Sequence, residues 1–236
     1  MTWSWEVAER DHEIQDPTSA EKIRLLGEYL RLDGSSRVLD VACGKAGPAL
    51  VLAEAFGCRI HGVELRPQFA DAARARVAER GLDGLVSIET ADAANYPLEP
   101  DAWDAALCLG ASFVWGHIGD AARMLAPAVR SGGFVAIGEP FSREAGVAES
   151  DCVDLAATAE RFQSAGLALT GLVAASEDDW DRYESLHWRA LEEWLADHAE
   201  HPEAAAIRAR HLAARDDYLR ARRARLGWAI FAGRKT

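Results

Sequence analysis

The feature that most constrains this chain is the stretch from Arg37 to Glu64, RVLDVACGKAGPALVLAEAFGCRIHGVE. Residues 38–41 are largely apolar and predict a short strand that is buried on both faces. A turn of small residues follows, and Pro48 suits the first turn of a helix, where a missing N–H costs nothing. Gly57 ends this helix, and residues 60–63 predict a second strand. The stretch therefore predicts a strand–turn–helix–strand unit of a parallel α/β sheet.

The same stretch predicts a ligand. A unit of this kind presents free backbone N–H groups and the positive end of a helix where the first strand ends. Glu64 closes the second strand and follows Gly44 by 20 positions (64 − 44). At that distance a carboxylate can accept both ribose hydroxyls of a bound nucleoside. These residues indicate a ligand that contains adenosine.

The turn itself fits two kinds of cofactor. As Ala42-x-Gly44-x-x-Gly47 it is a dinucleotide fingerprint without its first glycine, which would suit an NAD(P)-dependent or nucleotide-sugar oxidoreductase. Against this, no tyrosine is followed four positions later by lysine. As Asp40-x-Ala42-x-Gly44-x-Ala46 the motif instead begins with an acidic residue. Alanine at positions 42 and 46 requires φ to stay negative there.

Further strands and helices alternate along the chain. A helix is expected from Thr18, with Glu21 completing a capping box, and it stops at Asp33-Gly34. The later helices and strands alternate in the manner of a doubly wound α/β fold. Helices are expected at 67–80, 119–129 and 154–164, and strands at 85–88, 103–109, 134–138 (ended by Glu139-Pro140) and 167–174.

The C-terminal part interrupts this alternation. Two helical segments, at about 178–199 and 203–225, precede a last strand at 227–233. We interpret the helical pair as a cap inserted between the final two strands. The whole chain, 1–236, is then one domain, because its length hardly supports two. Its parts are an N-terminal arm and helix (1–35), a cofactor-binding core (36–176), the helical cap (177–225) and the last strand (226–236).

The composition of the chain limits the classes of binding partner that it can have. A net charge of −12 argues against nucleic acid, whose phosphates need a basic surface, and against an anionic membrane. No apolar run approaches the roughly 20 residues of a membrane-spanning helix, and the N-terminus lacks the apolar segment of a signal peptide. The four cysteines show no metal-binding spacing and are expected to be reduced thiols. We expect a cytoplasmic protein without a metal, either a monomer or a homodimer.

The motif that starts at Asp40 resembles the first motif of the class I S-adenosylmethionine (SAM) dependent methyltransferases, in which glycines occupy the positions of Ala42 and Ala46. Cys43-Gly44-Lys45 is similar to a variant found in the ubiquinone/menaquinone methylase group. The family's motif after strand four matches Leu109-Gly110-Ala111-Ser112, and Gly132-Gly133 matches the turn before strand five. The resemblance covers about 37–233 and implies a Rossmann-like, seven-stranded sheet of order 3-2-1-4-5-7-6 with the last strand antiparallel.

The resemblance also implies roles for particular residues. It assigns the ribose to Glu64, the adenine amino group to Asp92 and the methionine part of SAM to the Gly110 loop. The cofactor-binding residues expected on this basis are Asp40, Ala42, Gly44, Glu64, Leu65, Asp92, Ala93, Leu109 and Gly110. Because SAM is a sulfonium cation, the acidic residues among them suit it electrostatically.

Methyl transfer is an in-line displacement that depends mainly on positioning, and it needs a general base only when the acceptor must lose a proton. Glu139 and His117 are the candidates for such a base, although a structural role is at least as plausible for each. Ser112 is expected to contact the acceptor.

The predicted cap carries a stripe of aromatic residues. Tyr183 lies on this stripe and Trp188 lies beside it. They are expected either to pack the cap or to enclose an apolar or planar acceptor. The N-terminal arm, with Trp3, Trp5 and His12, is expected to approach from the other side.

The sequence therefore predicts a SAM-dependent methyltransferase that acts on a small molecule and releases S-adenosylhomocysteine. The alternatives are an NAD(P)-dependent oxidoreductase with a degenerate fingerprint and a SAM-binding protein without catalytic activity.

Overall fold

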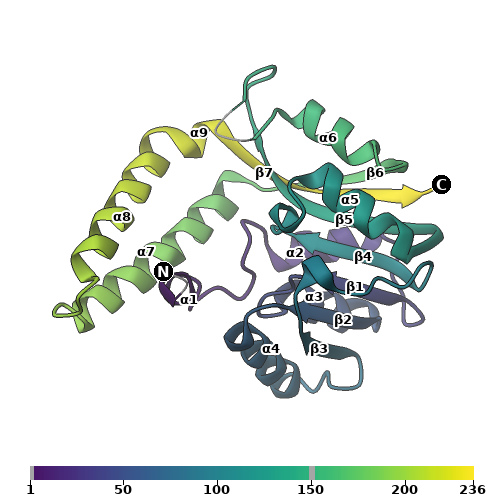
Figure 1. Ribbon diagram of the computed structural model, residues 1–236, viewed down its shortest axis with the longest axis horizontal. Coiled ribbons are helices and arrows are strands. Elements are labelled where there is room, and N and C mark those ends of the chain that lie inside the picture. Colours follow the sequence, from purple (N-terminus) through teal and green to yellow (C-terminus); the bar gives the residue numbers. More distant parts are fainter. Residues whose placement is uncertain (1–2, 149–151) are drawn as a thin grey trace.

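A computed structural model describes residues 3–148 and 152–236 of the chain (Figure 1). Its described strands form a single seven-stranded sheet of order β3-β2-β1-β4-β5-β7-β6. The strands are β1 (Arg37–Val41), β2 (Arg59–Glu64), β3 (Val86–Thr90), β4 (Trp103–Leu109), β5 (Val129–Ser142), β6 (Leu167–Ala174) and β7 (Leu226–Lys235). Strands β1 to β5 pair in parallel, and β7 pairs antiparallel with both β5 and β6. The predicted fold and strand order are confirmed.

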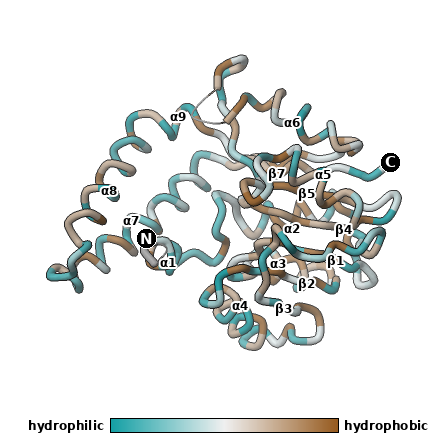
Figure 2. Tube along the Cα trace, in the orientation of Figure 1, coloured by the Kyte–Doolittle hydropathy of each residue, from teal (hydrophilic) through white to brown (hydrophobic). Residues whose placement is uncertain are grey.

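Side chains of alternate residues in each strand point to opposite faces of the sheet, and on both faces they pack against helices. Val38 belongs to a core cluster that packs α2 (Ala20–Tyr29), α3 (Gly47–Phe56) and α4 (Pro67–Glu79). Leu39, its neighbour, belongs to a second cluster that packs α5 (Ile118–Leu125) and α6 (Leu155–Gln163). Figure 2 shows the resulting contrast between apolar strands and the more polar outer helices. Helices on both faces place the carboxyl ends of β1, β2 and β4 along one open edge.

The cap consists of two helices that extend away from the sheet in Figure 1. Helix α7 (Glu177–Asp197) begins with a reciprocal capping box between Ser176 and Asp179. Helix α8 (Ala204–Asp217) returns along α7 and leads through a π-helical turn (Tyr218–Arg222) and the short α9 (Arg223–Arg225) into β7. At the N-terminus, α1 (Trp3–Ala8) packs against α7. The side chain of Trp3 lies outside the described part of the structure.

Three predicted boundaries are wrong for identifiable reasons. The N-cap of α2 is Ser19 and not Thr18, because the Ser19 side chain accepts the Lys22 N–H. The helix predicted at 119–129 ends at Leu125 because Pro127 continues the chain as a 3₁₀ turn. Strand β5 continues through Pro140 to Ser142, beyond the end of its pairing with β4 at Gly138. Among the described strands, β7 alone pairs with this extension, Ser142 makes one further bridge to Asp154, and a proline is tolerated at such an edge.

Two further observations concern the chain as a whole. None of the helices among the described residues has the length and apolar character needed to cross a membrane. All four cysteines are free thiols, and Cys43, Cys58 and Cys108 are buried.

Candidate active site at the carboxyl edge of the sheet

The turn after β1 adopts a left-handed backbone at three positions. Gly44 has φ of 56°, which glycine adopts at little cost. Ala42 and Ala46 have φ of 54° and 59°, so the prediction of negative φ at these alanines is wrong. Left-handed backbone at a non-glycine residue costs roughly 1–2 kcal/mol. The turn therefore keeps the shape that glycines would give it, at the expense of local strain.

Glu64 holds this turn against the end of β2. Its side chain is 5% exposed. One carboxylate oxygen accepts the Gly44 N–H at 2.9 Å, and the other accepts the Arg66 N–H at 2.8 Å. A carboxylate has about four acceptor positions, so two remain for a ligand. Glu64 can thus shape the turn and bind ribose hydroxyls at the same time.

The turn lines a cavity of about 250 Å³ at the carboxyl edge of the sheet. All the cofactor-binding residues predicted from the sequence lie in its wall: Asp40, Ala42, Gly44, Glu64, Leu65, Asp92, Ala93, Leu109 and Gly110. The structure brings together residues that β1, β2, β3 and β4 place at one edge. Asp92 also caps a short 3₁₀ turn through its bonds to the Ala94 N–H and the Asn95 amide.

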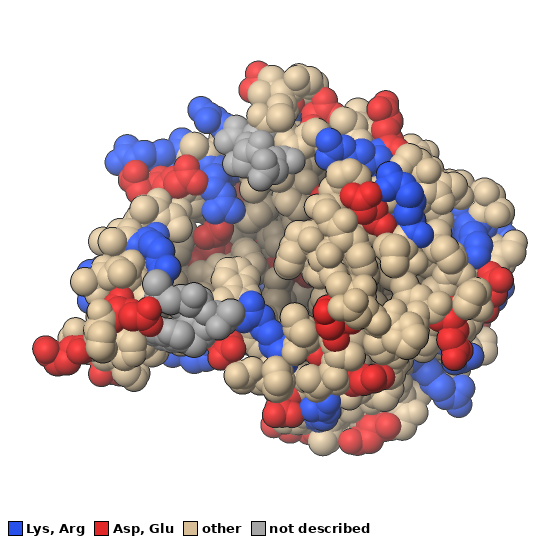
Figure 3. All heavy atoms as spheres, in the orientation of Figure 1, with Lys and Arg blue, Asp and Glu red and all other residues tan. Residues whose placement is uncertain are grey.

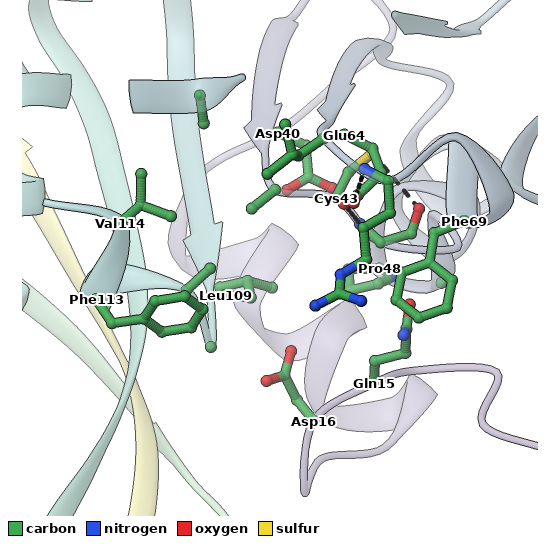
Figure 4. Close-up of a pocket in the computed structure, with 18 of the residues that line it drawn as sticks. Gln15, Asp16, Asp40, Cys43, Pro48, Glu64, Phe69, Leu109, Phe113 and Val114 are labelled. Atoms are coloured by element: carbon green, nitrogen blue, oxygen red, sulfur yellow. Dashed lines mark hydrogen bonds between the residues drawn. The ribbon is translucent and has the colours of Figure 1, made fainter. Parts of the chain in front are cut away.

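Two carboxyl groups make this cavity suitable for a cation. Burial, and next the charge of Asp16, raises the pKa of Asp40 to about 8. Burial, and next the charge of Glu9, raises the pKa of Asp16 to about 7. Among the described residues, Asp40 Oδ2 has no hydrogen-bond partner although it is buried. In Figure 4 the two side chains lie on opposite sides of the cavity. A positively charged ligand group would satisfy both.

Sequence reasoning missed the part of the wall that the N-terminal segment supplies. Gln15 accepts the Lys45 N–H at 2.7 Å, and the Arg76 guanidinium donates to the carbonyls of Glu13 and Lys45, each at 2.9 Å. These bonds fix residues 13–16 directly over the glycine turn. Trp5, Gln15 and Asp16 all line the cavity. The arm was expected to approach opposite the cap, and it also covers the cofactor turn, which no periodic pattern in residues 1–17 could have predicted.

The arm fits closely because two loops carry glycine. A Cβ at Gly110 would lie 2.0 Å from Asp16 Oδ1, and a Cβ at Gly44 would lie 2.2 Å from Gln15 Oε1. Gly110 also has φ of 75°. Both glycines are needed for the arm as well as for any ligand.

The three residues predicted near the reacting atoms line neither this cavity nor the one described next. Ser112 is buried and donates its hydroxyl to Glu139, which also accepts the Ile118 N–H at 3.3 Å. Burial raises the pKa of Glu139, and the bond from Ser112 opposes the change. His117 caps α5, where its Nδ1 accepts the N–H groups of Gly119 and Asp120. These contacts tie the loop after β4 to β5 and α5.

A second cavity, of about 630 Å³, adjoins the first beneath the cap. Figure 3 shows the molecule hollowed between the cap helices on the left and the sheet. Tyr183 and Trp188, predicted from the sequence, are in its wall together with Trp180 and Trp228. The residues that border both cavities are Trp5, Gln15, Asp16, Gly110 and Phe113. The two cavities are therefore contiguous.

Comparison with known proteins agrees with this geometry. Residues 38–133 match the family model described as a methyltransferase domain. A SAM-dependent methyltransferase from Thiobacillus denitrificans, solved with S-adenosyl-L-homocysteine, superposes with a TM-score of 0.91 at 30% identity over 98% of each chain. The Escherichia coli protein YjhP is 30% identical over 96% of this chain and 95% of its own length. The 27-O-demethylrifamycin SV methyltransferase of Amycolatopsis mediterranei is 29% identical over 70% of this chain and 58% of its own.

Proposed function

The chain belongs to the SAM-dependent methyltransferases of class I, and we propose that it methylates a small molecule held between its N-terminal arm and its helical cap. Family membership decides between the cofactors that the turn left open, in favour of SAM and against NAD(P). It also decides for an enzyme over a SAM-binding protein without activity. The acceptor and the roles of individual residues are proposals.

The cofactor is proposed to occupy the 250 Å³ cavity. Glu64 would accept the ribose hydroxyls with the lone pairs that its two backbone bonds leave unused. Asp92 would accept the adenine amino group. Asp16 lies beside Gly110, and Asp40 lines the cavity opposite it, so they would face the positive charges of the methionine part and the sulfonium. The unpartnered Asp40 Oδ2 supports this assignment.

The protein would contribute to the reaction mainly by positioning the methyl donor and the acceptor. The Gly110 loop lies where the two cavities meet, so it would set the line between methyl donor and acceptor. In-line displacement needs the reacting atoms about 3–3.5 Å apart and aligned. The bonds that Glu139 makes to Ser112 and to the Ile118 N–H hold this loop in place. When bound, SAM supplies the activated methyl group, and no covalent intermediate with the protein is required.

The single observation that carries the acceptor class is the second cavity. Its volume of about 630 Å³ lies in the range of small-molecule sites, and rings line it: Trp5, Phe113, Trp180, Tyr183, Trp188 and Trp228. Arg222, which also lines it, lies 3.8 Å from Glu184. A planar, largely apolar acceptor with a few polar groups would fit these walls. The Amycolatopsis relative, whose name gives a small-molecule substrate, supports this class.

Direct catalytic roles for Glu139 and His117 stay predictions. Because burial raises the pKa of Glu139, this carboxyl would accept a proton near neutral pH more readily than an ordinary glutamate. A substitution of Glu139 by glutamine that preserves the Ser112 contact but removes the pH dependence of the rate would favour a base. The division into arm, core, cap and last strand within one domain also stays a proposal.

The experiment is a screen of planar small molecules for S-adenosylhomocysteine release, followed by a matched pair of variants on α7. Trp188 lines the acceptor cavity, whereas Trp194 lies toward the cap tip and stacks on His198. Trp188→Ala should raise KM for the acceptor or lower kcat at least tenfold, with SAM affinity within about threefold, roughly 0.65 kcal/mol. Trp194→Ala should leave both constants near those of the wild type. Equal effects of the two variants would assign these aromatics to packing alone.

A further inference from the structure

The N-terminal arm meets the cap at a buried group of ionisable side chains to which the proposed methyl transfer assigns no role. Glu9 and His12 come from the arm, and His187 comes from α7; together they are called the arm–cap cluster. The side chains of Glu9 and His12 are 0% exposed, and that of His187 is 11% exposed. One potential ligand atom from each residue lies within 4.8 Å of the other two.

Hydrogen bonds fix the orientation of these side chains. His12 Nε2 lies 2.9 Å from the Tyr183 backbone carbonyl. A carbonyl only accepts, so Nε2 carries the proton, and a neutral His12 ring then has its lone pair on Nδ1. His187 Nε2 lies 2.7 Å from Glu9 Oε1, and the Tyr183 hydroxyl lies 3.3 Å from the same oxygen. Both histidine rings are therefore held by fixed partners.

One side of the cluster is left without a donor. His12 Nδ1 and Glu9 Oε2 face each other at 3.5 Å. Within the described residues, neither atom has a hydrogen-bond partner, although both are buried. The nearby Lys45 ammonium donates to the backbone carbonyls of Glu9 and Arg10, at 2.6 and 3.1 Å. A neutral imidazole and a carboxylate that point lone pairs at each other in a dry site repel each other, and a cation between them, either a proton or a metal ion, would satisfy both.

We propose that the arm–cap cluster binds one divalent transition-metal ion of the zinc class through Glu9 Oε2, His12 Nδ1 and His187 Nε2. Two imidazoles and a carboxylate suit zinc and its neighbours, whereas magnesium and calcium prefer oxygen ligands alone. The bond from His12 Nε2 to a backbone carbonyl is the outer contact that metal-bound histidines usually make. The ion would replace the proton that now lies between His187 and Glu9.

Such an ion would join two segments that are far apart in the sequence. Glu9 and His187 are separated by 178 positions, which is why no local spacing in the chain predicts a metal. Helices α1 and α7 lie side by side in Figure 1. His187 also lines the acceptor cavity, so the ion would lie at its edge and lock the arm onto the cap.

The test uses the full chain after removal of metals with a chelator, and it needs no acceptor. Co²⁺ is added as the probe, its visible absorption bands are recorded, and bound Zn²⁺ is measured by elemental analysis after gel filtration. We expect one equivalent of either metal, cobalt bands that Zn²⁺ abolishes, and a higher unfolding temperature with Zn²⁺. His12→Gln and His187→Gln should each weaken binding at least tenfold.

A control separates the cluster from adventitious binding by exposed imidazoles. His198 and His201 lie just beyond the far end of α7, where His198 stacks on Trp194 and His201 meets the same ring edge-on. The double variant His198→Gln/His201→Gln should bind like the wild type. Circular dichroism and SAM affinity check that each variant is folded, and Glu9→Gln replaces His12→Gln if that variant is not. Absence of stoichiometric binding, or loss of binding only in the control, would overturn the proposal. Because the readout is metal content, either result leaves the proposed acceptor untouched.

Discussion

The affinity of the protein for SAM should increase between pH 6 and pH 8, because the cofactor cavity contains Asp40. In the ligand-free protein this carboxyl has a pKa of about 8, raised first by burial and then by the charges of Asp16 and Glu64. It is therefore largely protonated at pH 6. A sulfonium or ammonium group beside it favours the ionised form and lowers its pKa in the complex. Binding then releases a proton, and the affinity depends on pH.

The magnitude follows from this linkage. If the pKa of Asp40 falls below 6 in the complex, each pH unit below its ligand-free value weakens binding by up to tenfold. Between pH 8 and pH 6 the Kd for SAM should therefore rise by roughly 10- to 100-fold, which corresponds to about 1.4–2.7 kcal/mol. Asp16, with a pKa of about 7, adds to the same trend.

Isothermal titration calorimetry in two buffers of different ionisation enthalpy measures both the Kd and the number of protons released. Asp40→Asn keeps the shape of the side chain but cannot ionise, so its Kd at pH 8 should be weaker and its pH dependence flatter. SAM's own amino group titrates equally with both proteins, and the difference between them isolates the carboxyl. Equal slopes for the wild type and Asp40→Asn would refute the reasoning.

The thermal stability of the ligand-free protein provides a second measurement, and the Asp40 contribution to it should fall with rising pH while the affinity for SAM increases. A carboxyl whose pKa rises from 3.8 to about 8 on folding binds its proton more tightly in the native state. That stabilisation is complete below pH 4 and is lost as pH rises toward 8. The change for Asp40 alone is about 6 kcal/mol as an upper bound. The stabilisation conferred by saturating SAM should correspondingly grow over this range.

Three further outcomes are expected. Glu64→Gln should weaken SAM binding by about 1–3 kcal/mol in calorimetric titration, because it removes a charged acceptor and turns an amide toward the Gly44 N–H; an unchanged Kd would contradict the assignment of the ribose. Ala42→Gly should raise the free energy of unfolding by about 1 kcal/mol in urea denaturation, since φ is 54°, whereas a lower value would mean that the turn is not strained. Gly110→Ala should displace Asp16, which a Cβ would approach to 2.0 Å, and weaken SAM binding more than tenfold; a wild-type Kd would show that the arm yields freely.

The sequence predicted the fold because the pattern that determines it is local. The apolar alternation in each strand and the glycines at helix ends depend on neighbouring residues, and the resemblance to a family added the strand order. The residues of the cofactor cavity could be chosen because each follows directly after a strand, and parallel strands end at one edge.

The arm and the acceptor site were harder because their contacts are distant in the sequence. Asp16 lines the cavity because hydrogen bonds join residues 13–15 to Lys45 and Arg76. No periodic pattern in the sequence predicts these bonds. His117 and Ser112 were placed near the chemistry by their position after β4, yet their side chains turn to cap α5 and to bond Glu139. Position along a strand predicts an edge of the sheet, but not the direction of each side chain.

Because the two cavities share a wall, the range of acceptors and the affinity for SAM cannot evolve independently. Trp5, Gln15 and Asp16 of the arm, with Gly110 and Phe113, border both cavities. A mutation in this wall that broadens the range of acceptors also changes the affinity for SAM. Selection for new acceptors is therefore constrained by the need to keep the cofactor bound. Trp188 and Trp228 border only the larger cavity. Diversification toward new acceptors, whether natural or in the laboratory, is least constrained at the cap and at β7.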